Sequence, residues 1–358
     1  MMSLNWWIRR IAVRTFGHGP RTVAPPGRLG ASLRLIRCEP GAAFRTFLPR
    51  VVDATTPTEV ASWPLADAQD PDRCVYVLRD AGLYDGDGVI YERPTHCALR
   101  DTLDYWGVPP ERHPAMGRPR ISAPQSLAGT SAFIGGLGGR TFFHFLVETL
   151  PQLAVLGPDL GSARRLIVQG YLEPTKEAWL RHAGVRLPIT WLQPLDHLLC
   201  EELIFCPRVA RRFQPSPWSV TALQSLVGAP MRSAGSRRRL IWADRRRSHM
   251  RFTSWEADLV AQLPSPWEAV EFSTLSPAQT LALCGECAAF AGLHGAAFAN
   301  LALCPPGVRV HEFYQEPKES WYPALSAATG HEHFVAMAAI GPTAIREQLT
   351  AEARCQAA

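Results

Sequence analysis

Apolar and polar positions alternate most regularly in the last third of the chain. Four apolar runs there have the length and composition of buried strands: RLIWA (239–243), EAVEF (268–272), AAFAG (288–292) and VRVHEF (308–313). Segments with helical spacing of apolar residues separate and follow them: 255–262, 277–284, 296–303 and 321–328. Strands that alternate with helices predict a parallel, doubly wound sheet.

A second α/β pattern lies between residues 131 and 206. SAFIGG (131–136) reads as a strand that enters a glycine-rich turn, and residues 141–156 have apolar side chains at helical spacing. Strand RLIVQG, a helix from Pro174 to Gly184, and strands ITWL and LLCEELIFC follow. The first 130 residues, rich in Pro and Gly, give only a weak pattern.

The fold class that these patterns predict is α/β, with two Rossmann-type lobes, parallel sheets and a cleft between them at the carboxyl ends of the strands. A Pro- and Gly-rich stretch, 214–235, has the composition of a connector. We therefore predict an N-terminal lobe at 1–225, a C-terminal lobe at 236–340, and a C-terminal helix or tail at 341–358.

Composition fits a globular chain of 358 residues with 47% hydrophobic and 19% charged residues, long enough for two domains. No run approaches the roughly 20 apolar residues of a membrane-spanning helix. At the N-terminus Arg9 and Arg10 follow the apolar residues, so we expect no secretory signal. The segment can instead form an amphipathic helix on an anionic membrane surface, or simply dock or fray.

Nine cysteines without regular spacing predict reduced thiols, no structural disulfide and a cytoplasmic protein. The net charge is +5, and arginines gather between Arg237 and Arg251. Such a cluster can face a polyanion, a phosphate or a membrane, but in an arginine-rich chain a solvated face is the simpler interpretation.

Candidate chemistry centres on the turn between the third and fourth strands of the C-terminal lobe. Gly292 and Gly295 let the backbone approach a ligand, and the helix that begins at Ala296 points its amide groups at the turn, where an anionic phosphate fits. His294 can donate a hydrogen bond to a diphosphate, and Asn300 can fix the turn or meet the ligand. A bare Gly-x-x-Gly, however, more often marks a tight turn with a buried histidine.

Three segments resemble glycosyltransferase family 61: GLHGAAFANLALCPPGVRVHEF, FFHFLVETLPQLAVL and LIWADRRRSHMR, in the family's order and within residues 131–335. This family includes capsular polysaccharide enzymes and eukaryotic xylosyl- and N-acetylglucosaminyltransferases. The chain departs from the family at Asp244, where serine is usual, and at Trp242, where tyrosine is usual. At Glu148 a relative can have aspartate.

The resemblance implies a GT-B-like, inverting glycosyltransferase that moves a sugar from a nucleotide-sugar, with UDP as the expected nucleotide, to a glycan or lipid-linked acceptor in surface polysaccharide biosynthesis. We expect the donor to bind the C-terminal lobe and the acceptor to enter from the N-terminal lobe. Glu312, which ends a strand, is placed to accept bonds from ribose hydroxyls. A cytoplasmic location, with peripheral contact to the inner face of the membrane, would suit such a reaction.

His144 and Glu148 are four residues apart in a helical pattern and therefore share a face. We expect Glu148 to act as general base toward the acceptor hydroxyl, with His144 as its orienting partner or alternate base. Arg245, and less directly Arg251, can grip the diphosphate and remove the need for a metal ion. We therefore expect no metal and no cofactor apart from the nucleotide-sugar.

Cys284 and Cys287 form a Cys-x-x-Cys pair, which we interpret as structural thiols because a fourth zinc ligand is lacking at a sensible spacing. Two other functions stay open: a non-catalytic nucleotide-sugar-binding partner subunit, and a nucleic-acid-binding protein that uses Arg237–Arg251. The second lacks aromatic residues interleaved for base stacking, so we expect no nucleic acid partner. A hydrolase would need a Gly-x-Ser-x-Gly elbow, and none is present. The sequence leaves the oligomeric state open.

Overall fold

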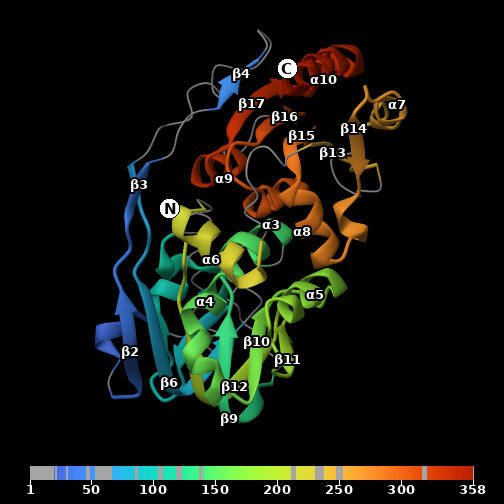
Figure 1. Cartoon of the computed structure of the whole chain (residues 1–358). Helices are drawn as coiled ribbons and strands as arrows, with labels where there is room; N and C mark the ends of the chain where they lie inside the picture. Colours follow the sequence, from blue (N-terminus) through green and yellow to red (C-terminus); the bar gives the residue numbers. More distant parts are fainter. Residues whose placement is uncertain are drawn as a thin grey trace. The chain divides into compact units, whose positions relative to one another are not determined.

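The computed structural model of the chain (Figure 1) describes residues 20, 22–29, 31–45, 49–52, 67–84, 88–103, 108–117, 123–136, 139, 141–210, 215–229, 238–246, 253–316 and 321–357. They form two compact units. Unit 1 comprises residues 1–42 and 70–213, and unit 2 comprises residues 43–69 and 214–358. Among the helices of the described ranges, none has the length and apolar character needed to cross a membrane.

Unit 1 is built on a mixed sheet. Its parallel half has the order β12-β9-β10-β11, and an antiparallel part extends it through β6, β7 and β8, with β1 at the end and β2 paired to β6. The strands are β1 Thr22–Ala24, β2 Leu33–Glu39, β6 Arg73–Tyr84, β7 Val89–Glu92, β8 Cys97–Leu99, β9 Gln125–Ile134, β10 Arg165–Gln169, β11 Ile189–Leu192 and β12 His197–Phe205. The predicted parallel pattern is therefore present from residue 125 onward, and the preceding residues add the antiparallel strands.

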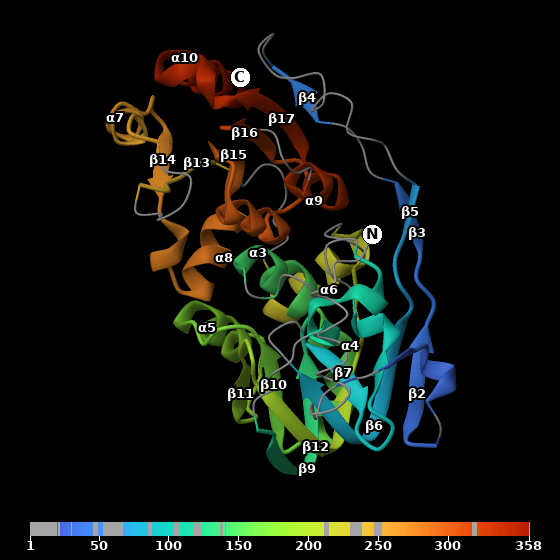
Figure 2. The ribbon, with the colours of Figure 1, turned by 180° about the vertical axis from the view of Figure 1, so that it is seen from behind.

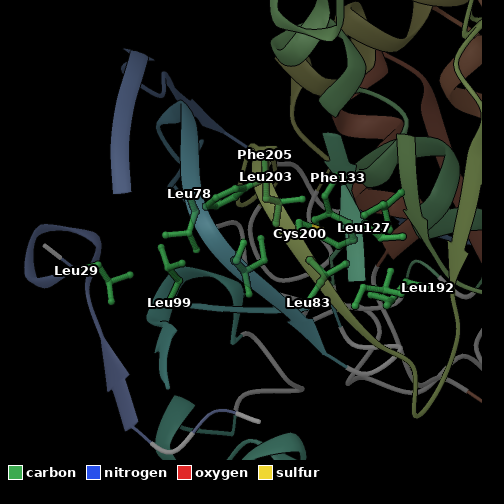
Figure 3. Packing of buried hydrophobic residues seen from close by; sticks show 14 residues of the cluster. Leu29, Leu78, Leu83, Leu99, Leu127, Phe133, Leu192, Cys200, Leu203 and Phe205 are labelled. Atoms are coloured by element: carbon green, nitrogen blue, oxygen red, sulfur yellow. The ribbon is translucent and has the colours of Figure 1, made fainter. Parts of the chain in front are cut away.

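The helices of unit 1 include α3 Phe142–His144, α4 Gln152–Leu156 and α5 Pro174–His182, with a π-helical turn, η5 Phe145–Thr149, between α3 and α4. Short 3₁₀ turns are η1 Pro26–Arg28, η2 Arg100–Thr102, η3 Pro110–Arg112, η4 Pro114–Gly117 and η6 Gly157–Ser162. A buried cluster of β6, β9, β11 and β12 side chains forms the core (Figure 3), as expected of strands whose apolar residues leave water together. Leu83, Leu203 and Phe205 in it are fully buried.

One expectation about unit 1 is wrong. Cys38 and Cys74 form a disulfide between β2 and β6. The two residues lie directly opposite each other on neighbouring antiparallel strands. They are 36 positions apart in the sequence, and their spacing carries no sign of this pairing. The expectation that all cysteines are reduced thiols therefore does not hold for Cys38 and Cys74, and these two residues give no support for a reducing compartment.

Unit 2 contains a fully parallel sheet with the order β14-β13-β15-β16-β17-β4. Its strands are β13 Arg239–Ala243, β14 Trp267–Val270, β15 Cys287–Leu293, β16 Arg309–Tyr314, β17 Glu332–Met337 and β4 Arg50–Val51. The first four correspond to the predicted runs. β17 and the two-residue β4 were not predicted, nor was the separate pair β3 Ala43–Arg45 and β5 Asp67–Gln69.

Helices cover both faces of this sheet. α7 Glu256–Ala261 and α10 Gly341–Ala357 contact each other on one side, and α6 Pro217–Val227, α8 Pro277–Gly285, η9 Ala296–Leu303 and α9 Trp321–Thr329 pack together on the other (Figures 1 and 2). A 3₁₀ turn, η8 Phe272–Thr274, follows β14, and another, η10 Ala338–Ile340, precedes α10. Because both faces are covered, the strands read as nearly continuous apolar runs. Trp267 Nε1 donates to Leu349 O at 2.8 Å and fixes α10 to the sheet.

The unit boundary differs from the predicted division at 225 and 236. Residues 43–69 belong to unit 2 because β4 pairs with β17, and α6 belongs there because it packs against η9 and α9. The predicted tail, 341–358, is largely the packed helix α10, in which Ile345 and Leu349 are fully buried. The connector 214–235 thus begins unit 2 instead of lying between the units.

Candidate functional site

The carboxyl ends of β13 and β15 form the natural ligand position of unit 2. In the sheet β13 lies between β14 and β15. The chain passes from β13 to β14 on one side, and from β15 to β16 on the other side. The connections that follow these two strands therefore diverge, and in open α/β sheets ligands bind at this kind of switch point. Arg245 follows β13, and the turn Gly292–Ala296 follows β15.

Arg245 lies on this turn. Its Nη1 donates a hydrogen bond to the carbonyl oxygen of His294. A Cβ on Gly295 would stand 2.8 Å from the Arg245 Cζ and 2.9 Å from its Nε, so only glycine leaves room for the guanidinium. Gly295 itself has extended backbone with φ 172°, which any residue can adopt. Its need for glycine comes from Arg245 and not from backbone strain.

Glu256, which the sequence analysis did not identify, holds the backbone of Arg245. Its Oε1 accepts a hydrogen bond from Arg245 N at 3.1 Å, and the side chain is buried at the start of α7. Burial raises the pKa of this carboxyl, and the Arg245 backbone hydrogen bond works in the opposite direction. The sequence does contain a signal for Glu256, since it is an acidic residue in the first turn of the helix that follows β13.

The other members of the predicted donor set have different surroundings. Gly292 packs closely against the neighbouring strand β13. A Cβ added to this glycine would lie 3.1 Å from the Ala243 Cβ. Ala296 is exposed at the start of η9. Asn300 is buried, and its Nδ2 donates to Ala297 O at 2.8 Å, a contact within η9 and not with the turn itself.

The predicted helix after the turn is a 3₁₀ helix, η9. The predicted bounds of this helix, 296–303, agree with η9, whose winding is tighter than that of an α-helix.

Glu312 lies beneath His294 and not at the surface. The carboxylate is completely buried. Its Oε1 lies 2.6 Å from His294 Nδ1, and its Oε2 lies 2.9 Å from both His333 Nε2 and the Tyr314 hydroxyl. This geometry differs from the predicted contact with ribose hydroxyls, because the carboxylate is enclosed by His294, His333 and Tyr314 and does not reach the surface.

The charge of Glu312 is stabilised in this buried position. Burial alone raises the pKa of a carboxyl, but the hydrogen bonds and charges of His294 and His333 outweigh it and lower the pKa of Glu312 to about 2. His333 extends the array, because its Nδ1 lies 2.7 Å from Ser326 Oγ. The His294 ring also packs between the Tyr314 and Tyr322 rings, at centroid distances of 4.8 and 5.0 Å.

Among the other described arginines of the basic cluster, Arg239 and Arg246 have acidic partners. Arg246 pairs with Asp244 at 2.7 Å, and Arg239 pairs with Glu268 at 2.6 Å and Glu286 at 3.1 Å. Arg251 and the other predicted members from 247 onward, like Arg237, lie outside the described residues. The pairing of Arg239 and Arg246 weakens the interpretation of the cluster as a nucleic-acid surface.

The structure brings His144 and Glu148 together in unit 1. His144 Nδ1 lies 3.0 Å from Glu148 Oε1, and the two side chains are 2% and 16% exposed. Both belong to the predicted helical segment, which has a π-helical turn at its centre. Leu150 N donates to Phe145 O, five residues earlier, just before Pro151, which has no N–H for an α-helical bond. Such π-turns are frequent at functional sites.

Glu148 lines a pocket of unit 1 at the carboxyl ends of β9 and β12. β9 lies between β10 and β12, all three strands are parallel, and part of the lining comes from the residues that directly follow β9 and β12. The pocket is lined by Gly88, Ile90, Asp101, Thr102, Phe133, Gly135, Gly136, Glu148, Gln152, Cys206, Pro207, Arg208, Val209 and Ala210. The sequence analysis did not identify Asp101, Thr102 or Arg208, which come from segments with weak patterns.

Buried polar side chains hold the glycine-rich turn beside this pocket. Gln152 pairs with both the N–H and the carbonyl of Gly135, at 3.0 and 2.6 Å, and Gln169 accepts a bond from Gly136 N. Lys176 is fully buried, which lowers its pKa, and its ammonium lies 3.1 Å from Glu173 and 3.4 Å from Gly139 O. These contacts fix the turn, whose Gly135 and Gly136 line the pocket together with Gln152.

The Cys-x-x-Cys pair does not form a site. Cys284 and Cys304 both donate to Asn300 O, at 3.6 and 3.5 Å, and Cys287 donates to Ala289 O at 3.3 Å. Across the described part of the chain, no group of three or more His, Cys, Asp or Glu residues is arranged to hold a metal ion.

Comparison with known proteins adds one match. The family model described as Glycosyltransferase 61 matches residues 142–311. This range begins at α3, contains His144 and Glu148, and includes Arg245 and the turn at Gly292–Ala296. A search of curated proteins finds no match to the chain.

Proposed function

We propose that the chain is a glycosyltransferase, on the basis of the match of residues 142–311 to the family model described as Glycosyltransferase 61, and we propose the identity of its substrates. The donor is a nucleoside diphosphate sugar, with uridine as the nucleoside, and the sugar passes with inversion to a glycan or lipid-linked acceptor in surface polysaccharide synthesis. The architecture we propose is GT-B-like: unit 2 binds the donor, and unit 1 carries the acceptor-side groups.

The proposed donor site is the switch point of unit 2. Arg245 contacts the His294 carbonyl and lies on Gly295, so a positive charge and an imidazole adjoin one turn at the carboxyl ends of two parallel strands. A guanidinium binds phosphate oxygens through two parallel hydrogen bonds, and it stabilises the negative charge that develops on the leaving diphosphate. In this proposal Arg245 supplies that charge without a metal ion.

The proposed acceptor site is the pocket of unit 1. Glu148 Oε1 is buried against His144, and the same side chain lines the pocket. As general base, Glu148 takes the proton of the acceptor hydroxyl while the oxygen attacks the anomeric carbon and the bond to the diphosphate breaks. A single displacement of this kind inverts the configuration at that carbon. The pocket lining includes Asp101, Glu148 and Arg208, polar groups that can bond the hydroxyls of a sugar.

The contact between Arg245 and the turn carries the proposal, and nucleotide binding tests it. We expect calorimetry without added metal to detect UDP binding in preference to GDP, CMP and TDP. Arg245→Ala and His294→Ala should each weaken UDP binding by roughly tenfold or more, about 1.4 kcal/mol. Arg246→Ala is the matched control, since Arg246 is the next residue, is exposed and pairs with Asp244. It should bind UDP like the wild type.

The variant Glu148→Gln tests whether this residue acts in the transfer reaction and not only in nucleotide binding. This variant should bind UDP normally but release UDP from the donor sugar at least a hundredfold more slowly, because the general base is lost. The control Glu177→Gln changes an exposed glutamate that pairs with Arg181. Absence of binding to every nucleotide by the folded wild type contradicts the donor assignment. Unchanged turnover in Glu148→Gln contradicts the catalytic one and favours a non-catalytic partner subunit.

A further inference from the structure

Three successive backbone amides at the end of β13 bond three different acceptors. Asp244 N donates to Val270 O at 2.9 Å, which extends the pairing of β13 with β14 by one residue. Arg245 N donates to Glu256 Oε1 at 3.1 Å. Arg246 N donates to Asp244 Oδ1 at 3.0 Å. The backbone is therefore fixed at Arg245 and at the residue on either side of it.

The two acidic side chains at this strand end hold neighbouring arginines in different ways. Asp244 pairs with the Arg246 guanidinium, whose Nε lies 3.0 Å from both carboxylate oxygens and whose Nη2 lies 2.7 Å from Oδ2. Glu256 bonds the backbone amide of Arg245, and the guanidinium of that arginine donates to the His294 carbonyl in the donor turn. Asp244 thus draws Arg246 onto itself, whereas Glu256 leaves the Arg245 guanidinium on the turn.

The surroundings of Glu256 indicate that it acts as a hydrogen-bond acceptor. The residue is 1% exposed and begins α7. Burial raises the pKa of its carboxyl, and the bond from the Arg245 amide and the charge of Arg245 offset this rise only in part. A buried polar group is costly unless it has a partner, and the partner here is a neutral amide. The position of the acceptor oxygen is therefore the feature that the geometry selects, more than the charge of the side chain.

We propose that Glu256 is a positioning residue for donor binding, whose Oε1 fixes the Arg245 backbone so that the guanidinium lies on the donor turn before the diphosphate binds. The inference rests on the proposed donor site and deepens it. An arginine side chain that moves freely loses conformational entropy when it binds a ligand, and one that is already held loses less. Glu256 acts on the diphosphate only through Arg245.

Two conservative variants separate the length of the Glu256 side chain from its charge. Glu256→Gln keeps the length and an oxygen that can accept the Arg245 amide bond, but it carries no charge. Glu256→Asp keeps the charge and shortens the side chain by one methylene group. In calorimetry, Glu256→Gln should bind UDP within about threefold of the wild-type affinity, whereas Glu256→Asp and Glu256→Ala should each bind about tenfold more weakly, about 1.4 kcal/mol.

A double variant tests whether Glu256 acts through Arg245. Arg245→Ala removes the guanidinium that Glu256 positions, so the addition of Glu256→Ala should weaken UDP binding by less than about twofold further. A residue that only supports the fold would weaken binding by the same factor with or without the arginine side chain. The control Asp258→Ala changes an exposed acidic residue in the same first turn of α7, and it should bind UDP like the wild type.

The outcomes separate this inference from the donor assignment. Wild-type affinity in Glu256→Asp and Glu256→Ala, or additive losses in the double variant, overturns the inference and leaves the donor site intact. A loss in Glu256→Gln as large as that in Glu256→Asp overturns it as well, because an acceptor oxygen of the right length then does not suffice. If the folded wild type does not bind UDP, the donor site itself is wrong, and this inference falls with it. If Glu256→Ala does not fold, the comparison of Glu256→Gln with Glu256→Asp decides the result.

Discussion

At the scale of single residues, the contact between Arg245 and Gly295 gives the donor turn its shape. Gly292 and Gly295 both stand in the Gly-x-x-Gly turn, but for different reasons. Gly292 lets β15 pack closely on Ala243 of β13, and Gly295 makes room for the Arg245 guanidinium. The two glycines therefore differ in what an added methyl group would disturb: a strand contact at the first and a flexible side chain at the second.

Gly295→Ala is expected to weaken UDP binding by about tenfold and to leave the free energy of unfolding nearly unchanged. The new Cβ would collide with the movable end of Arg245, at 2.8–2.9 Å, so the guanidinium shifts while the backbone, already extended, accepts alanine. Calorimetry and chemical denaturation measure the two effects. Gly161→Ala, where a Cβ meets nothing within 4 Å, is the control. Wild-type affinity in Gly295→Ala would show that Arg245 does not bind the nucleotide.

The sequence predicted site residues where a local motif contains them. His144 with Glu148, and Gly292 with His294 and Gly295, are each neighbours along the chain, and the structure places each group together. Glu256 and His333 could not be recognised in the same way. They reach Arg245 and Glu312 only through the pairing of strands and the packing of helices, which no local spacing records.

At the scale of elements, helix type was harder to predict than helix position. The segments 141–156 and 296–303 were identified as helical, but the first contains a π-turn and the second is a 3₁₀ helix. Pro151 explains the first difference through its missing N–H. The second segment, AAFANLAL, is apolar except for Asn300, so it has no polar face that would indicate the period of the helix.

The helix α10 is held on the sheet by Glu352, which predicts an acid-sensitive stability. Burial raises the pKa of Glu352, but its bonds to His311 at 3.0 Å, Gln356 and Arg309 at 2.9 Å outweigh this and lower it to about 2. A carboxyl whose pKa is lower in the folded state stabilises the protein above the unfolded value, near 4.3, and loses this contribution as pH falls toward 2.

Glu352→Ala should therefore lower the free energy of unfolding by about 2–3 kcal/mol at pH 7, because it leaves His311 and Arg309 without their buried partner. Urea denaturation at several pH values measures this. The difference between variant and wild type should shrink as pH falls from about 4.5 to 3. A difference that is constant over this range would mean that Glu352 stabilises α10 by packing alone. The exposed Glu347→Ala, on the same helix, is the control.

At the scale of the molecule, each unit is built on a sheet that contains parallel strands, and the proposed chemistry is divided between the two units. β13 and β15 flank the donor turn of unit 2, and β9 and β12 flank the pocket of unit 1. Strand patterns in the sequence predicted this repetition of parallel α/β structure from residue 131 onward. They did not predict the unit boundaries, because the excursion of 43–69 into unit 2 depends on strands of two and three residues.

The most direct test of the account is a crystal structure of the protein with UDP bound. The account predicts density for the diphosphate at the carboxyl ends of β13 and β15, with phosphate oxygens within hydrogen-bond distance of the Arg245 guanidinium and of His294 Nε2. The experiment decides between the two units, since the carboxyl ends of parallel strands are a ligand position in each. Diphosphate bound instead beside Glu148 in the pocket of unit 1 would contradict the account and reverse the roles proposed for the two units.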